Sequence, residues 1–303
     1  MDMASEATRR RLVLLEASRR AVQLVLFVLF NAGLWGLAST PLLLPILLPS
    51  ATPGRTVGNA FSIMEYMLSE GLAPLLPLAA FLVTGAILGR ALCGWACPFG
   101  LIQDILKHVR RRPTEVAVHT HRSASKLKYF VLALALLVGG TLALSLAAGV
   151  GEDYKKALGP FAGGPFTVLS PAETLFSLLP ALVVKLVEEK PEPWPFISGL
   201  PWLFWARLLI MVSVLVLVAY VPRAWCRYLC PVGALVAIFG RFSLLGLRIN
   251  MVKCDRCGEC MRVCPMMVRL LEQPPEKISD PDCIYCLRCV AACPHGAIKP
   301  RFP

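Results

Sequence analysis

Long apolar stretches alternate with polar and basic segments over most of the chain. The clearest apolar stretches lie at residues 21–38, 71–89, 127–149 and 202–221. Each approaches the ~20 residues that an α-helix needs to cross ~30 Å of hydrocarbon at ~1.5 Å rise per residue. The pattern therefore predicts a mainly α membrane protein, with four transmembrane helices within residues 21–249.

Three further apolar segments do not fit a simple span. Prolines interrupt residues 41–49, and residues 171–187 have the pattern of an amphipathic or re-entrant helix. Residues 232–249 contain Arg241 near their middle, and a charge at the centre of a bilayer is costly. We expect this last segment to form a helix in the membrane interface rather than a fifth span.

Basic residues set the expected orientation. Arginine and lysine concentrate in the N-terminal tail 1–20, in residues 90–128 and in the chain after Pro222, whereas residues 39–70 and 150–200 carry few. Because basic loops stay on the cytoplasmic side, both termini are predicted to be cytoplasmic. The protein is thus expected to be a multi-pass protein of the cytoplasmic membrane, in contact with lipid.

The overall composition agrees with this class. Of the 303 residues, 56% are hydrophobic and 17% are charged, whereas a soluble domain is nearer a quarter charged. The mean hydropathy is +0.65. The net charge of +12 would suit nucleic acid only if the basic residues shared one soluble face. They stand beside apolar runs instead, so no nucleic-acid partner is expected.

One motif occurs twice in the chain. Residues 90–100 read RALCGWACPFG and residues 223–233 read RAWCRYLCPVG, 133 positions later. The arginine, the alanine, both cysteines, the proline and the last glycine are shared. Each copy follows an even-numbered predicted helix at its cytoplasmic end. The chain is therefore expected to contain two repeated two-helix units, each ending in a C-x3-C-P motif.

A second pair of motifs defines the C-terminal segment, residues 250–303. Residues 254–265 and 283–294 both read C-x2-C-x2-C-x3-C-P, the pattern of bacterial two-cluster ferredoxins, in which the fourth cysteine binds the other cluster. Zinc is the alternative for cysteines in fours, but it rarely uses this doubled spacing. We expect an α+β ferredoxin-like module with two [4Fe–4S] clusters. The predicted ligands are Cys254, Cys257, Cys260 and Cys293 for cluster 1, and Cys264, Cys283, Cys286 and Cys289 for cluster 2.

The C-x3-C-P motifs contain all the remaining cysteines. Within a helix, cysteines at i and i+4 have β-carbons ~5–6 Å apart, which is too far for an unstrained disulfide. If the two units pack about a pseudo-twofold axis, the pairs face each other and form a redox thiol set or a further metal centre. The candidate residues are Cys93, Cys97, Cys226 and Cys230.

Arg90 and Arg223 stand three residues before the first cysteine of each motif. A positive charge near a thiol lowers its pKa and favours the thiolate, so the arginines predict activated cysteines. In an alternative interpretation the cysteines are small buried apolar residues, and the arginines only anchor helix ends.

The combined motifs resemble the NapH family over nearly the whole chain. The resemblance rests on CGWACPFG at 93–100, CRYLCPVG at 226–233 and the two ferredoxin motifs. It implies a membrane component of a quinol dehydrogenase, which passes electrons between the quinone pool and iron–sulfur or haem partner subunits. Related modules occur in the NosR and CcoG groups.

These patterns predict a membrane-bound iron–sulfur subunit that links quinone or quinol, its substrate, to a partner oxidoreductase. Two other functions fit the same motifs. One is a reductive assembly factor for a respiratory metalloenzyme, which reduces a metal ion or a disulfide through the C-x3-C-P cysteines. The other is a membrane anchor in which the clusters are mainly structural.

Overall fold

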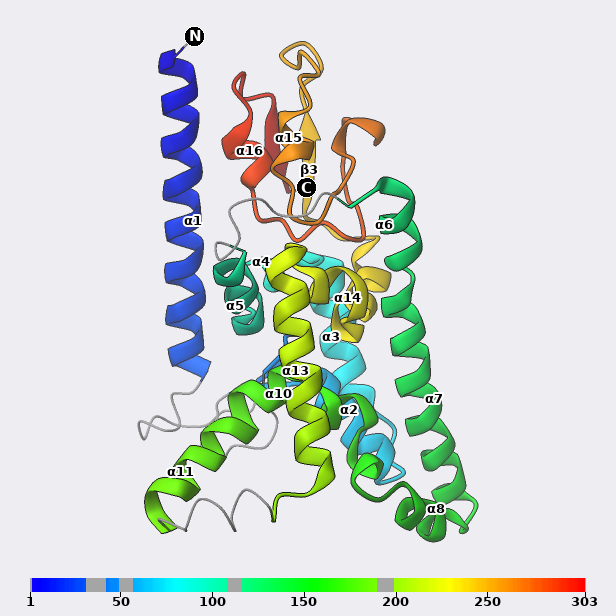
Figure 1. Ribbon diagram of the computed structural model, residues 1–303. Coiled ribbons are helices and arrows are strands. Elements are labelled where there is room, and N and C mark those ends of the chain that lie inside the picture. Colours follow the sequence, from blue (N-terminus) through cyan, green and yellow to red (C-terminus); the bar gives the residue numbers. More distant parts are fainter. Residues whose placement is uncertain (1, 31–41, 49–56, 108–115, 190–198, 303) are drawn as a thin grey trace.

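The computed structural model describes residues 2–30, 42–48, 57–107, 116–189 and 199–302. Helices account for most of the chain, and the cysteine-rich C-terminal segment forms a compact cap at one end of the helical part (Figure 1). The principal helices of the helical part are α1 (Asp2–Phe30), α2 (Ala60–Ser69), α3 (Leu75–Leu88), α4 (Ala91–Trp95), α5 (Pro98–Leu106), α6 (Val118–Ala124), α7 (Leu127–Ala147), α8 (Gly151–Leu158), α11 (Leu179–Glu189), α13 (Trp202–Tyr220) and α14 (Pro231–Gly240).

Among the residues that the structure describes, two helical stretches are long and apolar enough to cross a membrane. They are Val118–Ala147, which joins α6 and α7, and Trp202–Tyr220, which is α13. Both expose large apolar side chains, including Phe130, Leu144 and Leu209. An apolar outer surface of this kind suits contact with lipid.

The other two expected spans are not shown by the structure. Helix α3 has only 14 residues, about 21 Å at ~1.5 Å per residue, which is shorter than a typical span. Helix α1 is continuous from the basic N-terminal tail to Phe30, and the rest of the predicted span 21–38 lies outside the described residues.

The segments with ambiguous patterns adopt three different structures. Residues 171–187 are helical, through α10 (Pro171–Glu173), a π-helical turn at Thr174–Leu178 and α11. The prediction of one interfacial helix over 232–249 extends the helix too far. Helix α14 ends at Gly240, and β3 (Gly246–Ile249) follows. Helix α14 is also largely buried, since it packs against α3 and α7. Part of 41–49 forms β1 (Leu42–Leu44), which pairs in parallel with β2 (Val57–Asn59).

The C-terminal module combines short helices with one small sheet. Strand β3 pairs antiparallel with β4 (Ile298–Arg301), and the helices are α15 (Glu259–Arg262) and α16 (Arg288–Ala292). Leu247 and Ile298 are buried in the module together with most of its cysteines. The module therefore has the α+β character that the motifs predicted.

Close contact between α3 and α14 holds the two repeated units together. A β-carbon added at Gly85 of α3 would lie 2.6 Å from the Cβ atom of Phe239, closer than packed atoms allow. At the next turn, a β-carbon on Gly240 would lie 3.2 Å from the Cα atom of Gly89. Glycine thus permits two helix backbones to touch.

The substitution Gly85→Ala should separate α3 from α14 and destabilise the protein by about 1–3 kcal/mol, the usual cost of overpacking. Gly140→Ala is the matched control, because nothing lies within 4 Å of its added β-carbon. Thermal unfolding in detergent measures both variants. Equal melting temperatures for the two variants would contradict the close packing at Gly85.

Candidate functional site

The two C-x3-C-P motifs interlock through their arginines. The guanidinium of Arg90, in the first copy, donates to the carbonyl oxygen of Cys226 in the second copy at 2.9 Å. Arg223, in the second copy, donates to the carbonyl oxygen of Cys93 in the first at 3.2 Å. The exchange is reciprocal, and it is the pseudo-twofold packing that the sequence repeat suggested.

The last glycine of each motif lies against the arginine of the other. A β-carbon at Gly233 would lie 2.7 Å from Nη2 of Arg90, so the absence of a side chain makes room for this guanidinium. A β-carbon at Gly100 would lie 3.5 Å from Nη2 of Arg223, an ordinary contact, and 3.2 Å from the carbonyl oxygen of Cys93. Each copy thus supplies an arginine that packs beside the last glycine of its counterpart, and the fit is tighter at Gly233.

The two cysteines of each motif do not lie on one regular helix. Cys97 and Cys230 have extended backbone conformations and stand immediately before α5 and α14. Pro98 and Pro231 occupy the first turns of those helices, where a missing N–H group costs nothing. The proline of C-x3-C-P thus begins a new helix directly after the second thiol.

The four thiols are each 8% exposed or less, and burial is the largest influence on the pKa of Cys97, Cys226 and Cys230. Burial, together with the neighbouring Cys226 and Cys93, raises the pKa of Cys97 to about 12. Burial also raises the pKa of Cys226, although Arg223 and Arg90 act in the opposite direction, and the pKa of Cys230 is raised well above its ordinary value by burial and Cys226.

The expectation that arginines favour thiolates at this site is therefore wrong for the chain by itself. Removal from water disfavours the charged form more than the arginines favour it. The two pairs nevertheless lie in neighbouring parts of the structure, since Gln103, in the helix that follows Cys97, donates to Sγ of Cys226. Several thiolates can share such a buried space only when a metal centre balances their charge.

Two N–H donors, from Gln103 and Gly233, contact the thiols of the second motif. Its Nε2 atom donates to Sγ of Cys226 at 3.0 Å, and the backbone N–H of Gly233 donates to Sγ of Cys230 at 3.3 Å. The Oε1 atom of Gln103 is buried and has no hydrogen-bond partner in the described part of the chain. Sulfurs that accept hydrogen bonds, beside an unsatisfied oxygen, fit a site that holds a metal or cluster.

Asp104 is the centre of a buried network of charges. Its carboxylate pairs with Arg223 at 2.7 Å and with Arg19 of α1. Arg288 of α16 lies 3.6 Å away and also pairs with Glu16 of α1. Burial alone would raise the pKa of Asp104, but Arg223, Arg19 and Arg288 outweigh it and hold this pKa well below its usual range.

The ferredoxin module lies directly on the first C-x3-C-P motif. A β-carbon at Gly94 would lie only 2.3 Å from the carbonyl oxygen of Ile284, so glycine is required at this contact. The indole Nε1 of Trp95 donates to the carbonyl oxygen of Tyr285 at 2.9 Å. Ile284 and Tyr285 lie within the second ferredoxin motif. Cys93 belongs to the same buried hydrophobic core as that motif's cysteines.

Asp282 fixes the module to the helical part by charge. It pairs with Arg90 at 2.8 Å and with Lys128 at the start of α7. Burial would raise the pKa of Asp282, but Arg90 and Lys128 overcome this effect and lower it. Arg90 thus contacts both the second C-x3-C-P motif and the ferredoxin module.

The second C-x3-C-P motif does not receive the module in the same way. Arg227 occupies the position that corresponds to Gly94. Its guanidinium contacts Sδ of Met267 and Nδ1 of His121, and His121 also lies 3.2 Å from the hydroxyl of Tyr228. Because Met267 belongs to the ferredoxin module, the second motif meets the module through the charged side chain of Arg227. The first motif meets it at Gly94, which has no side chain.

The two ferredoxin motifs have the same unusual backbone. Positive φ angles occur two residues after the first cysteine of each motif, at Arg256 and Tyr285, and again at Gly258 and Leu287 after the second cysteine. A third pair follows the fourth cysteine, at Met267 and Gly296. Non-glycine residues rarely adopt this conformation and do so at some cost.

Backbone N–H groups also point at the fourth sulfur of each motif. Val268 donates to Sγ of Cys264 at 3.4 Å, and Ala297 donates to Sγ of Cys293 at 3.3 Å. Tight loops that carry thiols, with N–H···S hydrogen bonds, fit the demands of iron–sulfur clusters. Within the described ranges, no three His, Cys, Asp or Glu side chains form a group suited to a single metal ion.

The two predicted clusters differ in exposure. The ligands predicted for cluster 2 are buried apart from the partly exposed Cys264, whereas Cys257 of cluster 1 is exposed and Cys254 is partly exposed. The site predicted for cluster 1 is therefore the more exposed of the two, and the site predicted for cluster 2 is the more buried. The assignment of individual cysteines to clusters remains a prediction.

Sequence reasoning did not identify Gln103, Asp104 or Asp282 as parts of the site. The available signal was a difference between the repeats, since Val236 and Ala237 stand where the first copy has Gln103 and Asp104. Polar residues that appear in only one copy indicate a contact that only one copy makes.

Comparison with known families agrees with the motifs. A family model described as a 4Fe-4S binding domain matches twice, at residues 70–115 and 203–250, and each match contains one C-x3-C-P motif. A second model, a 4Fe-4S dicluster domain, matches residues 246–294. The double match confirms the internal repeat, and the dicluster match confirms the ferredoxin-like segment.

Several curated proteins are similar at low identity. An uncharacterized protein of Methanocaldococcus jannaschii is 28% identical over 75% of this chain and 71% of its own length. YccM of Escherichia coli, which is named for electron transport, is 26% identical over 76% of this chain and 58% of its own. The ferredoxin-type protein NapH of Haemophilus influenzae is 27% identical over 71% and 63%. No solved structure matches.

The substitution Asp104→Asn should destabilise the protein by about 3–5 kcal/mol, because it leaves buried arginines without their carboxylate. Thermal unfolding in detergent measures the loss, and Asp153→Asn, on an exposed carboxylate, is the matched control.

Because the folded-state pKa of Asp104 is depressed, its contribution is present above ~pH 3.9 and falls as the pH drops toward the lower folded value. The wild-type protein should therefore lose stability on acidification through this range, and the Asp104→Asn variant should lose less. An identical pH profile for both would contradict the network.

Proposed function

We propose that this chain, an iron–sulfur electron-transport protein of the ferredoxin type related to NapH and YccM, links the quinone pool to a partner oxidoreductase of a respiratory complex. The main support is the direct contact between the second ferredoxin motif and the first C-x3-C-P motif. This contact joins a solvent-facing redox module to a cysteine site at the end of candidate membrane helices.

Continuous packing supports an electron path through this contact. Cys93 shares a buried cluster with Cys283, Cys286 and Cys289, and Trp95 is hydrogen-bonded to the backbone of Tyr285. Two [4Fe–4S] clusters in the module would supply one-electron chemistry when bound. The protein's own residues hold the loops in place, exclude water and balance charge around the buried thiols.

The four C-x3-C-P cysteines are better placed for an internal relay than for chemistry on external substrates. A reductive assembly factor would need thiols that reach a metal ion or a disulfide of another protein. Cys93, Cys97, Cys226 and Cys230 are all buried. Their burial favours a bound redox centre, and it makes the assembly-factor alternative the weaker proposal.

Quinol should reduce the clusters of the purified protein in lipid nanodiscs. The measurement is low-temperature EPR of reduced [4Fe–4S] signals after addition of a soluble quinol under anaerobic conditions, with dithionite as the positive control. If dithionite reduces the clusters and no quinol of suitable potential does, the quinone-linked function is wrong.

Replacing Cys93 and Cys226 together by serine tests whether the C-x3-C-P cysteines hold iron. If they do, the iron content should fall from a value above about eight per chain toward the eight of two [4Fe–4S] clusters. Cys257→Ser is the comparison, because it should affect a ferredoxin cluster instead. An iron content that stays near eight in wild type and double variant alike would favour thiol chemistry at these cysteines.

A further inference from the structure

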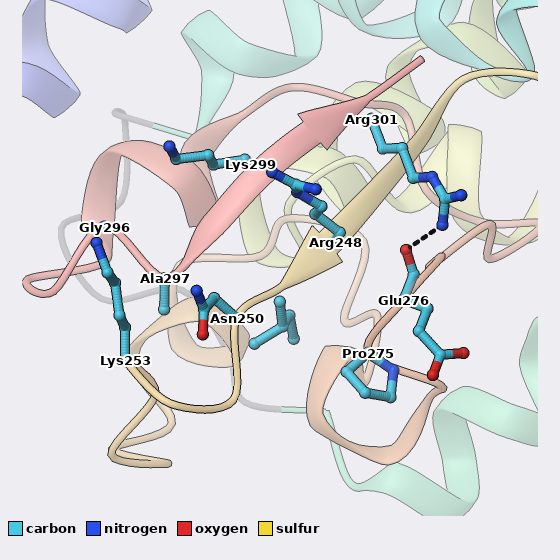
Figure 2. Close-up of a pocket in the computed structure, with 10 residues that line it drawn as sticks. Arg248, Asn250, Lys253, Pro275, Glu276, Gly296, Ala297, Lys299 and Arg301 are labelled. Atoms are coloured by element: carbon cyan, nitrogen blue, oxygen red, sulfur yellow. Dashed lines mark hydrogen bonds between the residues drawn. The ribbon is translucent and has the colours of Figure 1, made fainter. Parts of the chain in front are cut away.

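A basic groove lies on the ferredoxin module beside the ligands predicted for cluster 1. It is about 470 Å³ in volume and is lined by residues of β3, β4 and the neighbouring loops. Figure 2 shows Arg248 and Lys299 on the two facing strands, with Arg301 farther along β4. Lys253, the residue before Cys254, completes the set of four exposed cations.

The groove has little negative charge of its own. Glu276 is its one acidic lining residue, and Arg301 donates to the backbone carbonyl of Glu276 rather than to its carboxylate. Among the residues that the structure describes, none of the four cations forms an ion pair with a carboxylate. An external anionic group would therefore meet unneutralised charge here.

The strand register places like charges opposite one another. Arg248 pairs directly with Lys299 in the antiparallel β3–β4 ladder. Like charges in facing positions repel and destabilise a sheet. A negatively charged partner would relieve this repulsion, so the arrangement suits a bound state better than the isolated module.

Exposed apolar side chains stand next in sequence to residues that line the groove, and they favour a protein partner. Val252 is 96% exposed, Met251 is 43% exposed, and Phe302, next to Arg301, is 60% exposed. The side chain of Asn250 accepts a hydrogen bond from the N–H of Val252 and so orders this turn. Apolar anchors within a charged rim are typical of protein interfaces, whereas a small anion would need no such anchors.

The position of the groove favours a soluble protein over a membrane surface. In Figure 1 the loop that follows β3 rises above α15, at the end of the module away from α7 and α13. The same loop carries Val252 and Lys253, and on the other side of the groove Ala297 donates its N–H to Sγ of Cys293. A partner seated here would lie beside cluster 1, the solvent-facing end of the module.

We propose that this groove is the docking site for an acidic soluble protein that carries one electron at a time. This docking site rests on the proposed function, because a partner can exchange electrons here only if cluster 1 is redox active. One electron leaves the reduced centre of the partner and enters the module, or passes in reverse. No bond breaks and no proton moves in this exchange. Complementary charge would steer the encounter and orient the partner.

The test uses an acidic [2Fe–2S] ferredoxin as the probe and the cluster-loaded protein in nanodiscs of neutral lipid. Binding is measured by surface plasmon resonance at low and high salt, for wild type and for the double variant Lys253→Glu/Lys299→Glu. We expect the double variant to bind at least about tenfold more weakly at low salt, and high salt to weaken wild-type binding.

The double variant Arg262→Glu/Arg269→Glu is the matched control, since it makes the same change of charge at two positions of the module outside the groove, where Arg262 pairs with Glu259 and Arg269 with Glu272. It should bind the ferredoxin within about twofold of wild type. Equal binding by the groove variant and wild type, or no binding by wild type at low salt, would overturn the proposal. So would loss of wild-type binding in nanodiscs of anionic lipid, which would mean that the membrane occupies the groove.

Reduction by quinol separates this proposal from the proposed function. The groove variant should be reduced by quinol as wild type is, because neither Lys253 nor Lys299 belongs to a C-x3-C-P motif or to a candidate membrane helix. Failure of quinol reduction with intact ferredoxin binding would overturn the quinone link and leave the docking site standing.

Discussion

The pairing of Asp104 with three arginines is the interaction on which the rest of the structure depends. Arg19 comes from the N-terminal helix, Arg223 from the second C-x3-C-P motif and Arg288 from the ferredoxin module. A buried charge is tolerated only when it is paired, so none of these elements can leave without exposing the others to a large cost. One carboxylate thereby fixes the position of the redox module over the cysteine site.

Local patterns predicted the parts of the molecule that local physics controls. The repeat at residues 90–100 and 223–233 predicted two related units, and the structure adds that the arginine of each motif contacts the other. The doubled ferredoxin spacing predicted an α+β module because thiolates that share a cluster require a tight loop. Hydropathy identified α7 and α13 because their apolar runs are long and uninterrupted.

Features that depend on tertiary contacts could not be predicted in this way. Residues 232–249 have a continuous apolar pattern, but α14 ends at Gly240. The later residues Gly246–Ile249 form β3, which pairs with β4, about 50 residues farther along the chain. The arginines near the thiols suggested lowered pKa values, yet burial has a larger effect than Arg223 and Arg90 on the pKa of Cys226. Burial and long-range pairing depend on neighbours that are distant in sequence.

The exchange of Gly94 for Arg227 makes the two motifs meet the ferredoxin module in different ways. At Gly94 the backbone of Ile284 approaches closely because no side chain intervenes. At the matching position of the second copy, the long side chain of Arg227 reaches Met267 of the same module and His121. The two contacts are not interchangeable, so a module placed on a nearly symmetric repeat has only one orientation in which both are made.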